Sequence, residues 1–119
     1  MAIKVIGQEL TSNGSGDASV TITTSGGLLR QLVLVPDSVA TPTTSWDVLI
    51  SDIAGVTLYS DTAIGTSAEV HVPLRAGTLT GGTASSLIEG LVCVGTSLTI
   101  TGANMGAAKK ARVYLYLED

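Results

Sequence analysis

The sequence is poor in the residues that carry most enzyme chemistry. Its 119 residues include one cysteine, one histidine, one tryptophan and no phenylalanine, and aromatic residues total 3 %. A single cysteine excludes an internal disulfide, and one histidine with one cysteine is too small a ligand set for a zinc site. No G-x-S-x-G element is present, so a Ser-His-Asp triad would depend on His71 alone. We therefore expect no enzymatic activity, no catalytic residue, no metal site and no cofactor.

Charge is also scarce. Charged residues make up 13 % of the chain, about half of the roughly 25 % that is usual in soluble domains. A monomer with so few charges would expose a Ser/Thr-rich surface with little repulsion between copies. We therefore expect much of the surface to be covered in a stable assembly. The alternative is a small, stable β domain that is simply weakly charged.

Two partner classes are disfavoured by the same composition. A formal net charge of −4 argues against nucleic acid as the main partner. Lys109, Lys110 and Arg112 form a cationic cluster, but no nucleic-acid motif surrounds it, and we interpret it as a solvated edge or a contact with an acidic partner surface. The longest apolar run is far shorter than the about 20 residues that cross a bilayer. The first ten residues lack the pattern of a signal peptide. We therefore expect a protein that is made in a cytosol and does not bind a membrane.

Two-residue alternation of apolar and polar residues dominates the chain, and helical periodicity is almost absent. Segments such as "ASVTITT" and "ARVYLYLED" are typical of strands with one buried face. We predict an all-β chain that forms a single antiparallel β-sandwich, or jelly-roll-like, domain of about eight or nine short strands over residues 1–119. Residues 1–10 are expected to be an N-terminal arm or first strand, and residues 75–86 a flexible loop.

The segment "SWDVLISDIAGVTLYSD", residues 45–61, predicts a hairpin. Trp46, Val48 and Ile50 alternate on one face, and "DIAG" supplies a turn in which Asp52 accepts hydrogen bonds from backbone amides. The acids of this segment lack the ligand spacing of a calcium loop, although an ion site remains the alternative. In the later strand "TSAEVHVPL" we expect the valines to face the core and His71 to be an ordinary, partly exposed side chain.

The last strand carries the candidate contact residues. Tyr114 and Tyr116 lie two residues apart, so they project from the same face as Arg112, opposite the apolar residues. Paired tyrosines on a solvent face suit a subunit or partner contact. The alternative is that a second sheet covers this face, or that the tyrosines pack only on adjacent strands.

The order of these segments resembles a known group of proteins. The series "GDASVTITTSGGLLRQLVLVP", "SWDVLISDIAGVTLYSD", "VHVPLRAG" and "GTSLTITGANMGAAKKARVYLYLED" is similar to the small, weakly charged β-sandwich structural proteins of tailed-bacteriophage virions. A strand, D-x-x-G, strand hairpin and a closing "LTITGAN … VYLY" segment carry the likeness. The likeness extends over most of the chain, but it is one of general sequence pattern and includes no diagnostic binding or catalytic motif.

The resemblance implies a capsid decoration (cement) protein or another minor head protein. Such a protein would form a homo-oligomer, expected to be a trimer, and would bind the major capsid protein or other virion proteins. It would be assembled in the host cytoplasm and located on the capsid surface of the virion. The alternative function is a carbohydrate- or receptor-binding β-sandwich module of a phage fibre or tail, or of a lectin-like protein.

Overall fold

The computed structural model describes residues 2–78 and 84–118, with the backbone only for residues 74–78 and 84–93. The described residues contain strands and no helix. The strands are β1 (Ile3–Thr11), β2 (Ala18–Thr23), β3 (Gly27–Pro36), β4 (Trp46–Asp52), β5 (Thr57–Ile64), β6 (Glu69–His71), β7 (Leu74–Thr78), β8 (Ala84–Val94), β9 (Ser97–Ala103) and β10 (Lys110–Glu118).

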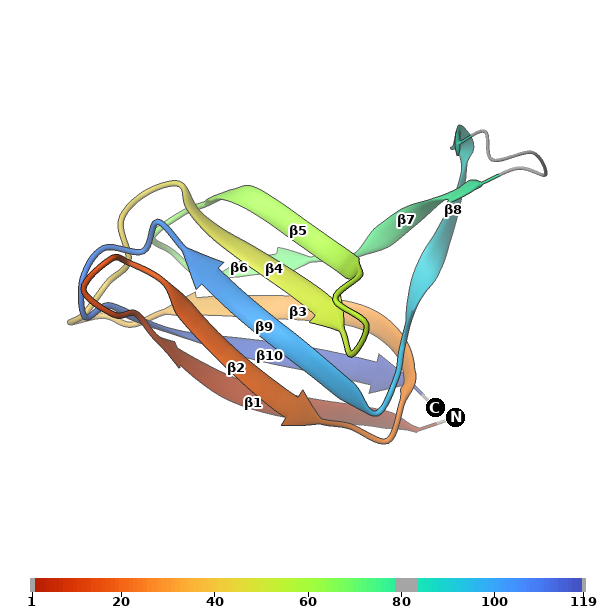
Figure 1. Cartoon of the computed structure of the whole chain (residues 1–119), viewed down its shortest axis with the longest axis horizontal. Coiled ribbons are helices and arrows are strands. Elements are labelled where there is room, and N and C mark those ends of the chain that lie inside the picture. Colours follow the sequence, from red (N-terminus) through yellow and green to blue (C-terminus); the bar gives the residue numbers. More distant parts are fainter. Residues whose placement is uncertain (1, 79–83, 119) are drawn as a thin grey trace.

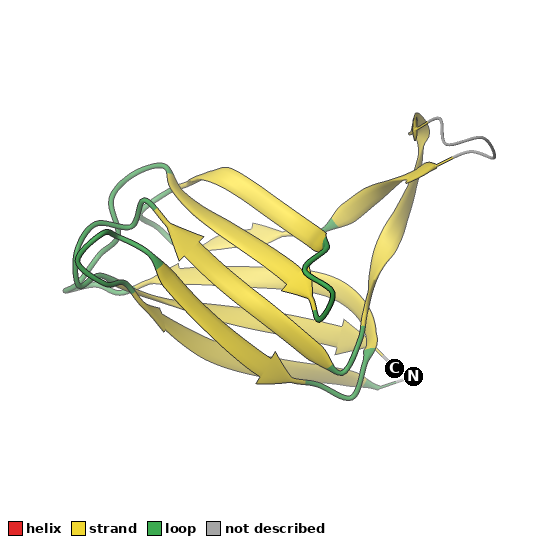
Figure 2. Cartoon of the chain, in the orientation of Figure 1, coloured by secondary structure: helices red, strands yellow, loops and turns green. Residues whose placement is uncertain are grey.

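Two antiparallel sheets pack face to face (Figures 1 and 2). In the first sheet β10 lies between β1 and β3, and β3 pairs with β8 along Gly27–Leu29 and with β6 along Leu32–Leu34. The second sheet has the order β2-β9-β4-β5. The predicted β-sandwich is therefore confirmed.

The core lies between the sheets and is filled mainly by aliphatic side chains. Alternate residues of each strand point inward, so each sheet contributes one apolar face. Trp46 is the largest fully buried side chain, as its place in the predicted hairpin indicated. The other fully buried large side chains are Leu10, Leu29, Leu32, Leu34, Ile50, Ile64, Leu98, Ile100, Met105, Leu115 and Leu117.

The β4–β5 hairpin has the turn that the sequence predicted. Asp52 Oδ1 accepts hydrogen bonds from the backbone N–H groups of Ala54 and Val56, both at 2.9 Å. Gly55 has φ = 81°, a left-handed conformation that glycine adopts without strain. The Asp52 carboxylate thus stabilises the turn that brings β5 back along β4.

A second close contact joins the turn after β1 to the loop before β10. The carbonyl of Gly16 accepts a 3.0 Å hydrogen bond from Met105 N–H. Gly16 has φ = 84°, and a Cβ at this position would lie 3.0 Å from the backbone nitrogen of Gly106. Only glycine suits both the backbone conformation and the close approach of these two loops.

The segment 75–86, expected to be a flexible loop, contributes most of its length to strands. β7 pairs with β8 from Leu74↔Leu91 to Thr78↔Ala84, with a register shift between Ala76 and Gly77. Residues 79–83 lie outside the described part of the chain. Figure 1 shows β7 and the adjoining part of β8 extending away from the two packed sheets. The segment expected to be an arm or a first strand, residues 1–10, lies almost entirely in β1 at one edge of the first sheet.

Removing the Ile100 side chain beyond Cβ should destabilise the protein strongly. Ile100 is fully buried on β9, opposite Ile50 of β4 and Val20 of β2. Ile100→Ala should lower the free energy of unfolding by about 2–5 kcal/mol, because it removes apolar contacts and leaves a cavity. Urea unfolding followed by the fluorescence of Trp46 measures the change.

The matched control deletes the same atoms from the surface. Ile53 lies in the β4–β5 turn and is 86 % exposed. Ile53→Ala should change the free energy of unfolding by less than about 0.5 kcal/mol. Equal effects of the two substitutions would contradict the described core.

Candidate functional site

β6 is oriented opposite to the sequence prediction. Val70 and Val72 were expected in the core, but they are 64 % and 60 % exposed. Glu69 and His71 instead point toward the second sheet and are partly buried. The alternating pattern correctly grouped the residues by face, but it assigned the wrong face to the core. The physical reason is that β6 lies beside β3 at the margin of the sandwich, where polar side chains from β5 meet it.

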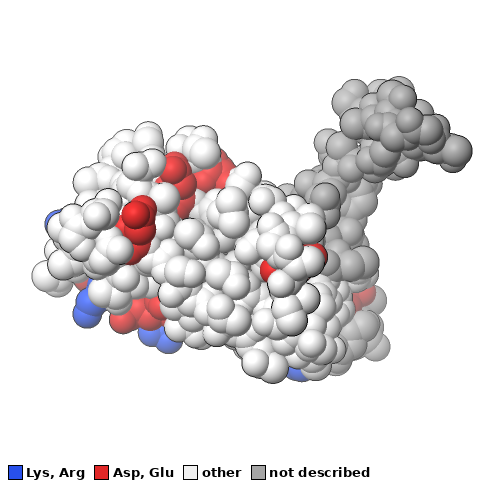
Figure 3. Space-filling model, in the orientation of Figure 1, with Lys and Arg blue, Asp and Glu red and all other residues white. Residues whose placement is uncertain are grey.

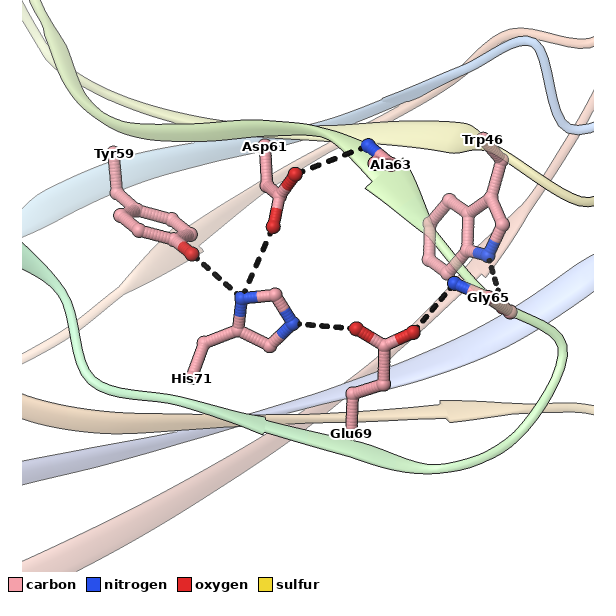
Figure 4. A network of polar contacts seen from close by, with 7 residues as sticks. All are labelled: Trp46, Tyr59, Asp61, Ala63, Gly65, Glu69 and His71. Atoms are coloured by element: carbon pink, nitrogen blue, oxygen red, sulfur yellow. Dashed lines mark hydrogen bonds and ion pairs between the residues drawn. The ribbon is translucent and has the colours of Figure 1, made fainter.

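His71 is the centre of a polar cluster between β5 and β6 (Figure 4). Its Nδ1 lies 2.6 Å from the hydroxyl oxygen of Tyr59 and 3.4 Å from Asp61 Oδ2. Its Nε2 lies 2.8 Å from Glu69 Oε1. A proton on Nε2 lets His71 donate to Glu69, whereas the direction of the hydrogen bond between Nδ1 and Tyr59 depends on the tautomer.

The cluster continues through the backbone to the core tryptophan. Glu69 Oε2 accepts a hydrogen bond from Gly65 N–H, and the carbonyl of Gly65 accepts one from Trp46 Nε1 at 3.0 Å. A Cβ on Gly65 would come within 2.9 Å of Glu69 Oε2. Asp61 is held by Ala63 N–H at 3.0 Å. The contacts therefore tie the connection between β5 and β6 to both sheets (Figure 4).

The environment shifts the pKa values of two ionisable groups in the cluster, Glu69 and Tyr59. The hydrogen bond from Gly65 N–H, followed by that from His71, lowers the pKa of Glu69. Partial burial, followed by the nearby charges of Asp61 and Glu69, raises the pKa of Tyr59. A tyrosine with a raised pKa holds its proton at neutral pH and is a poor nucleophile. Each of the four side chains in the cluster has a hydrogen-bond partner, and together these contacts link β5 to β6.

No metal-binding or membrane-spanning arrangement is found in the described residues. Over residues 2–73 and 94–118, whose side chains the structure describes, no three histidine, cysteine, aspartate or glutamate side chains are placed to hold a metal ion. Within the same ranges, no helix has the length and hydrophobicity that crossing a bilayer requires.

Sequence reasoning missed the polar cluster because its members come from separate strands. "EVH" places Glu69 and His71 on one face of β6, and "YSD" places Tyr59 and Asp61 on one face of β5. Each pair alone is ordinary for a half-exposed strand. The available signal was that both pairs are polar and two residues apart, but only the topology shows that they meet.

The three predicted contact residues lie together on β10, in the interior of the first sheet. Tyr114 and Tyr116 are half-buried and Arg112 is exposed, all on the face turned away from the second sheet. The tyrosine rings pack on adjacent strands: Tyr114 lies over Gly7, and Tyr116 is opposite Val5. No strand described in the structure covers this side of the sheet (Figure 1).

We call this surface the outer face of the first sheet. Its apolar residues are Ile3, Val5, Val33, Val35, Val70, Tyr114 and Tyr116, with Val72 just after β6, and its polar residues include Glu9, Gln31, Lys110, Arg112 and Glu118. A shallow hollow of about 480 Å³ opens on it between Ile3, Arg30 and Val72. The face is broad, mostly apolar and edged with polar groups, which suits contact with another macromolecule better than enclosure of a small ligand.

The Glu69 contacts should make stability sensitive to acid. Because the folded-state pKa of Glu69 is lowered, its contribution to stability is complete above its ordinary value of 4.5 and is lost as the pH falls through the folded value. Glu69→Gln should therefore lose less free energy of unfolding than the wild type when the pH is lowered through this range. Urea unfolding at a series of pH values, followed by Trp46 fluorescence, measures the difference.

Glu9→Gln is the matched control for this experiment. Glu9 is an exposed carboxylate on β1 whose contacts are the side chains of Thr11 and Arg112. The lowered pKa of Asp37 has the same sign but is common to all three proteins, so it cancels from the comparison. An acid profile of Glu69→Gln that is parallel to the wild-type profile would contradict the assigned role of Glu69.

Comparisons with protein families and with curated proteins found no match. No protein-family model matches the chain, and no curated protein is significantly similar to it. We therefore infer function from the composition, fold and surfaces of the chain itself.

Proposed function

We propose that the protein is a non-enzymatic structural component of a tailed-bacteriophage virion. It self-associates, with a trimer as the expected assembly, and binds the outer capsid lattice as a decoration protein that stabilises the shell. Its partners are copies of itself and the major capsid protein or other virion proteins. Its place of action is the capsid surface, after assembly in the host cytoplasm.

The observation that carries the structural role is the outer face of the first sheet. Tyr114 and Tyr116 lie at its centre, and exposed aliphatic side chains such as Val5 and Val70 flank them. A broad face of this kind is typical of interfaces with macromolecules. The His71 cluster supports the same role, because its groups bond to one another across the sandwich.

The virion assignment is supported by the sequence resemblance together with the fold. The D-x-x-G segment that carries the likeness forms the β4–β5 hairpin, and the closing "VYLY" segment lies in β10. Low charge and an all-β sandwich suit a protein that works by packing against like copies and a shell. The projecting β7–β8 hairpin adds a second feature that could reach a neighbouring subunit.

The carbohydrate-binding alternative receives less support. Sugar sites commonly present aromatic rings to solvent beside hydrogen-bonding groups. Trp46 is fully buried and its Nε1 bonds to Gly65, while the hydroxyl of Tyr59 bonds to His71. Tyr114 and Tyr116 remain, but both are half-buried in a mostly apolar face.

The virion role is tested on particles made with and without this chain. Purified particles are analysed by mass spectrometry, and their disruption is followed during heating by release of the genome. We expect the chain in the purified particles in many copies, and we expect particles without it to release their genome at a lower temperature. Such a result follows from added contacts between neighbouring shell subunits.

The control restores the chain to the deficient particles. Purified protein added back should bind the shell and raise the temperature of genome release to that of complete particles. Absence of the chain from purified particles would overturn the virion assignment. Binding of a glycan by the isolated chain, without binding to particles, would favour the alternative function.

A further inference from the structure

We propose that the outer face of the first sheet is the surface through which copies of this chain contact one another. The inference rests on the self-association in the proposed function and names the surface that mediates it. Contact between two identical faces joins copies in pairs, so a trimer requires that different parts of this face meet on neighbouring copies. Four adjacent strands build this surface: β1, β10, β3 and β6. Its exposure, its area and its charge each favour a second copy as the occupant.

Exposed apolar side chains cross the whole face. The pairing register places Val5 beside Tyr116, and it places Val33 between Tyr114 and Val70. Two neighbouring rows therefore cross the face, Val5–Tyr116–Gln31 and Gly7–Tyr114–Val33–Val70, and neither row contains a charged residue. The four most exposed large apolar side chains on the face are between 50 % and 64 % exposed: Ile3, Val5, Val70 and Val72. A contiguous patch of this kind on a soluble protein marks an interaction surface.

The area of the face is of the same order as one side of a specific interface. β1 and β10 have nine residues each, β3 has ten and β6 has three. At about 3.4 Å per residue and a spacing of about 4.8 Å between strands, their combined flat footprint is about 500 Å². The relief of the side chains makes the accessible surface larger than this footprint. Stable interfaces bury about 800 Å² on each partner, so this face would form most of one side of such a contact.

The charges on this face balance one another. Arg112 lies 4.0 Å from Glu9, and Arg30 lies 3.3 Å from Glu118. Lys110 is close enough to Asp37 to help lower the pKa of that carboxyl, after the stronger effect of the backbone N–H groups that bond to it. A face with balanced charges selects neither a strongly acidic nor a strongly basic partner. It presents no net repulsion to a copy of itself.

The second sheet, unlike the outer face of the first sheet, carries an excess of acidic groups. Asp47 and Asp52 lie near the two ends of β4, and Figure 3 shows several separate acidic patches on the side of the molecule that includes this sheet. The chain as a whole has a net charge of −4. Two copies that approached through their second sheets would bring acidic groups together, whereas contact through the first sheets keeps these groups apart. The distribution of charge therefore favours the first sheet as the contact between copies.

Lysine substitutions on the outer face test the proposal. Val70→Lys and Val5→Lys each place a charge in one of these two rows, on strands at opposite sides of the face. Ile53→Lys is the matched control, because it makes the same change of charge at an exposed turn of the second sheet. All three substitutions reduce the net negative charge, so a loss of association cannot come from stronger overall repulsion. Light scattering after size-exclusion chromatography, over a concentration series, measures the mass of each protein.

We expect the wild type and Ile53→Lys to be oligomers of the same mass. Val70→Lys and Val5→Lys should raise the dissociation constant by about tenfold or more, because burying an unpaired charge in an interface is costly. Circular dichroism during heating shows whether each variant is folded. Two substitution sites keep the test valid if one variant fails to fold.

Four results would overturn one of the proposals or distinguish between them. A wild-type protein that stays monomeric throughout the concentration series would overturn the inference. An oligomer that both lysine variants leave intact would also overturn it, although self-association itself would stand. The particle experiment tests the virion role independently. If the chain binds particles but associates through another surface, the virion role stands and the inference fails. If the chain associates through this face but is absent from particles, the inference stands and the virion role fails.

Discussion

The fold depends on burying one apolar face of each sheet against the other. Trp46 and the surrounding leucines and isoleucines fill this layer without a phenylalanine. Branched aliphatic side chains pack well on a pleated surface and leave no polar atom unsatisfied. The polar side chains therefore lie in turns, at strand margins and on the faces turned away from the core. Those placements produce both of the features on which a function can be argued.

The polar cluster around His71 closes the margin that the apolar core does not reach. Its side chains come from β5 and β6, and Glu69 connects it through Gly65 to the indole of Trp46. A bonded cluster at this position holds the two sheets in one relative arrangement, because leaving any member unpaired would carry a desolvation cost. The same arrangement turns Val70 outward. The polar margin and the apolar outer face are therefore two results of a single strand orientation.

The outer face of the first sheet is the surface on which the proposed contact between copies depends. Tyr114 and Tyr116 occupy its centre because β10 is an interior strand, between β1 and β3. The balanced charges of this face and the acidic character of the second sheet give the molecule two different sides. A protein that must pack against its own copies while leaving a second surface for another partner benefits from such a division. Low overall charge, which was the first unusual property of the sequence, is consistent with this use.

The sequence alone determined the all-β class, the β4–β5 hairpin with its Asp52 turn, the burial of Trp46, and the shared face of Tyr114 and Tyr116. These follow from local rules, since alternation and turn residues act over a few positions. Only the tertiary structure decided which side of β6 faces the core, that residues of the expected loop 75–86 belong to paired strands, and that His71 meets Tyr59. Alternation states which residues share a face, but the neighbouring strands decide whether that face meets the other sheet or solvent.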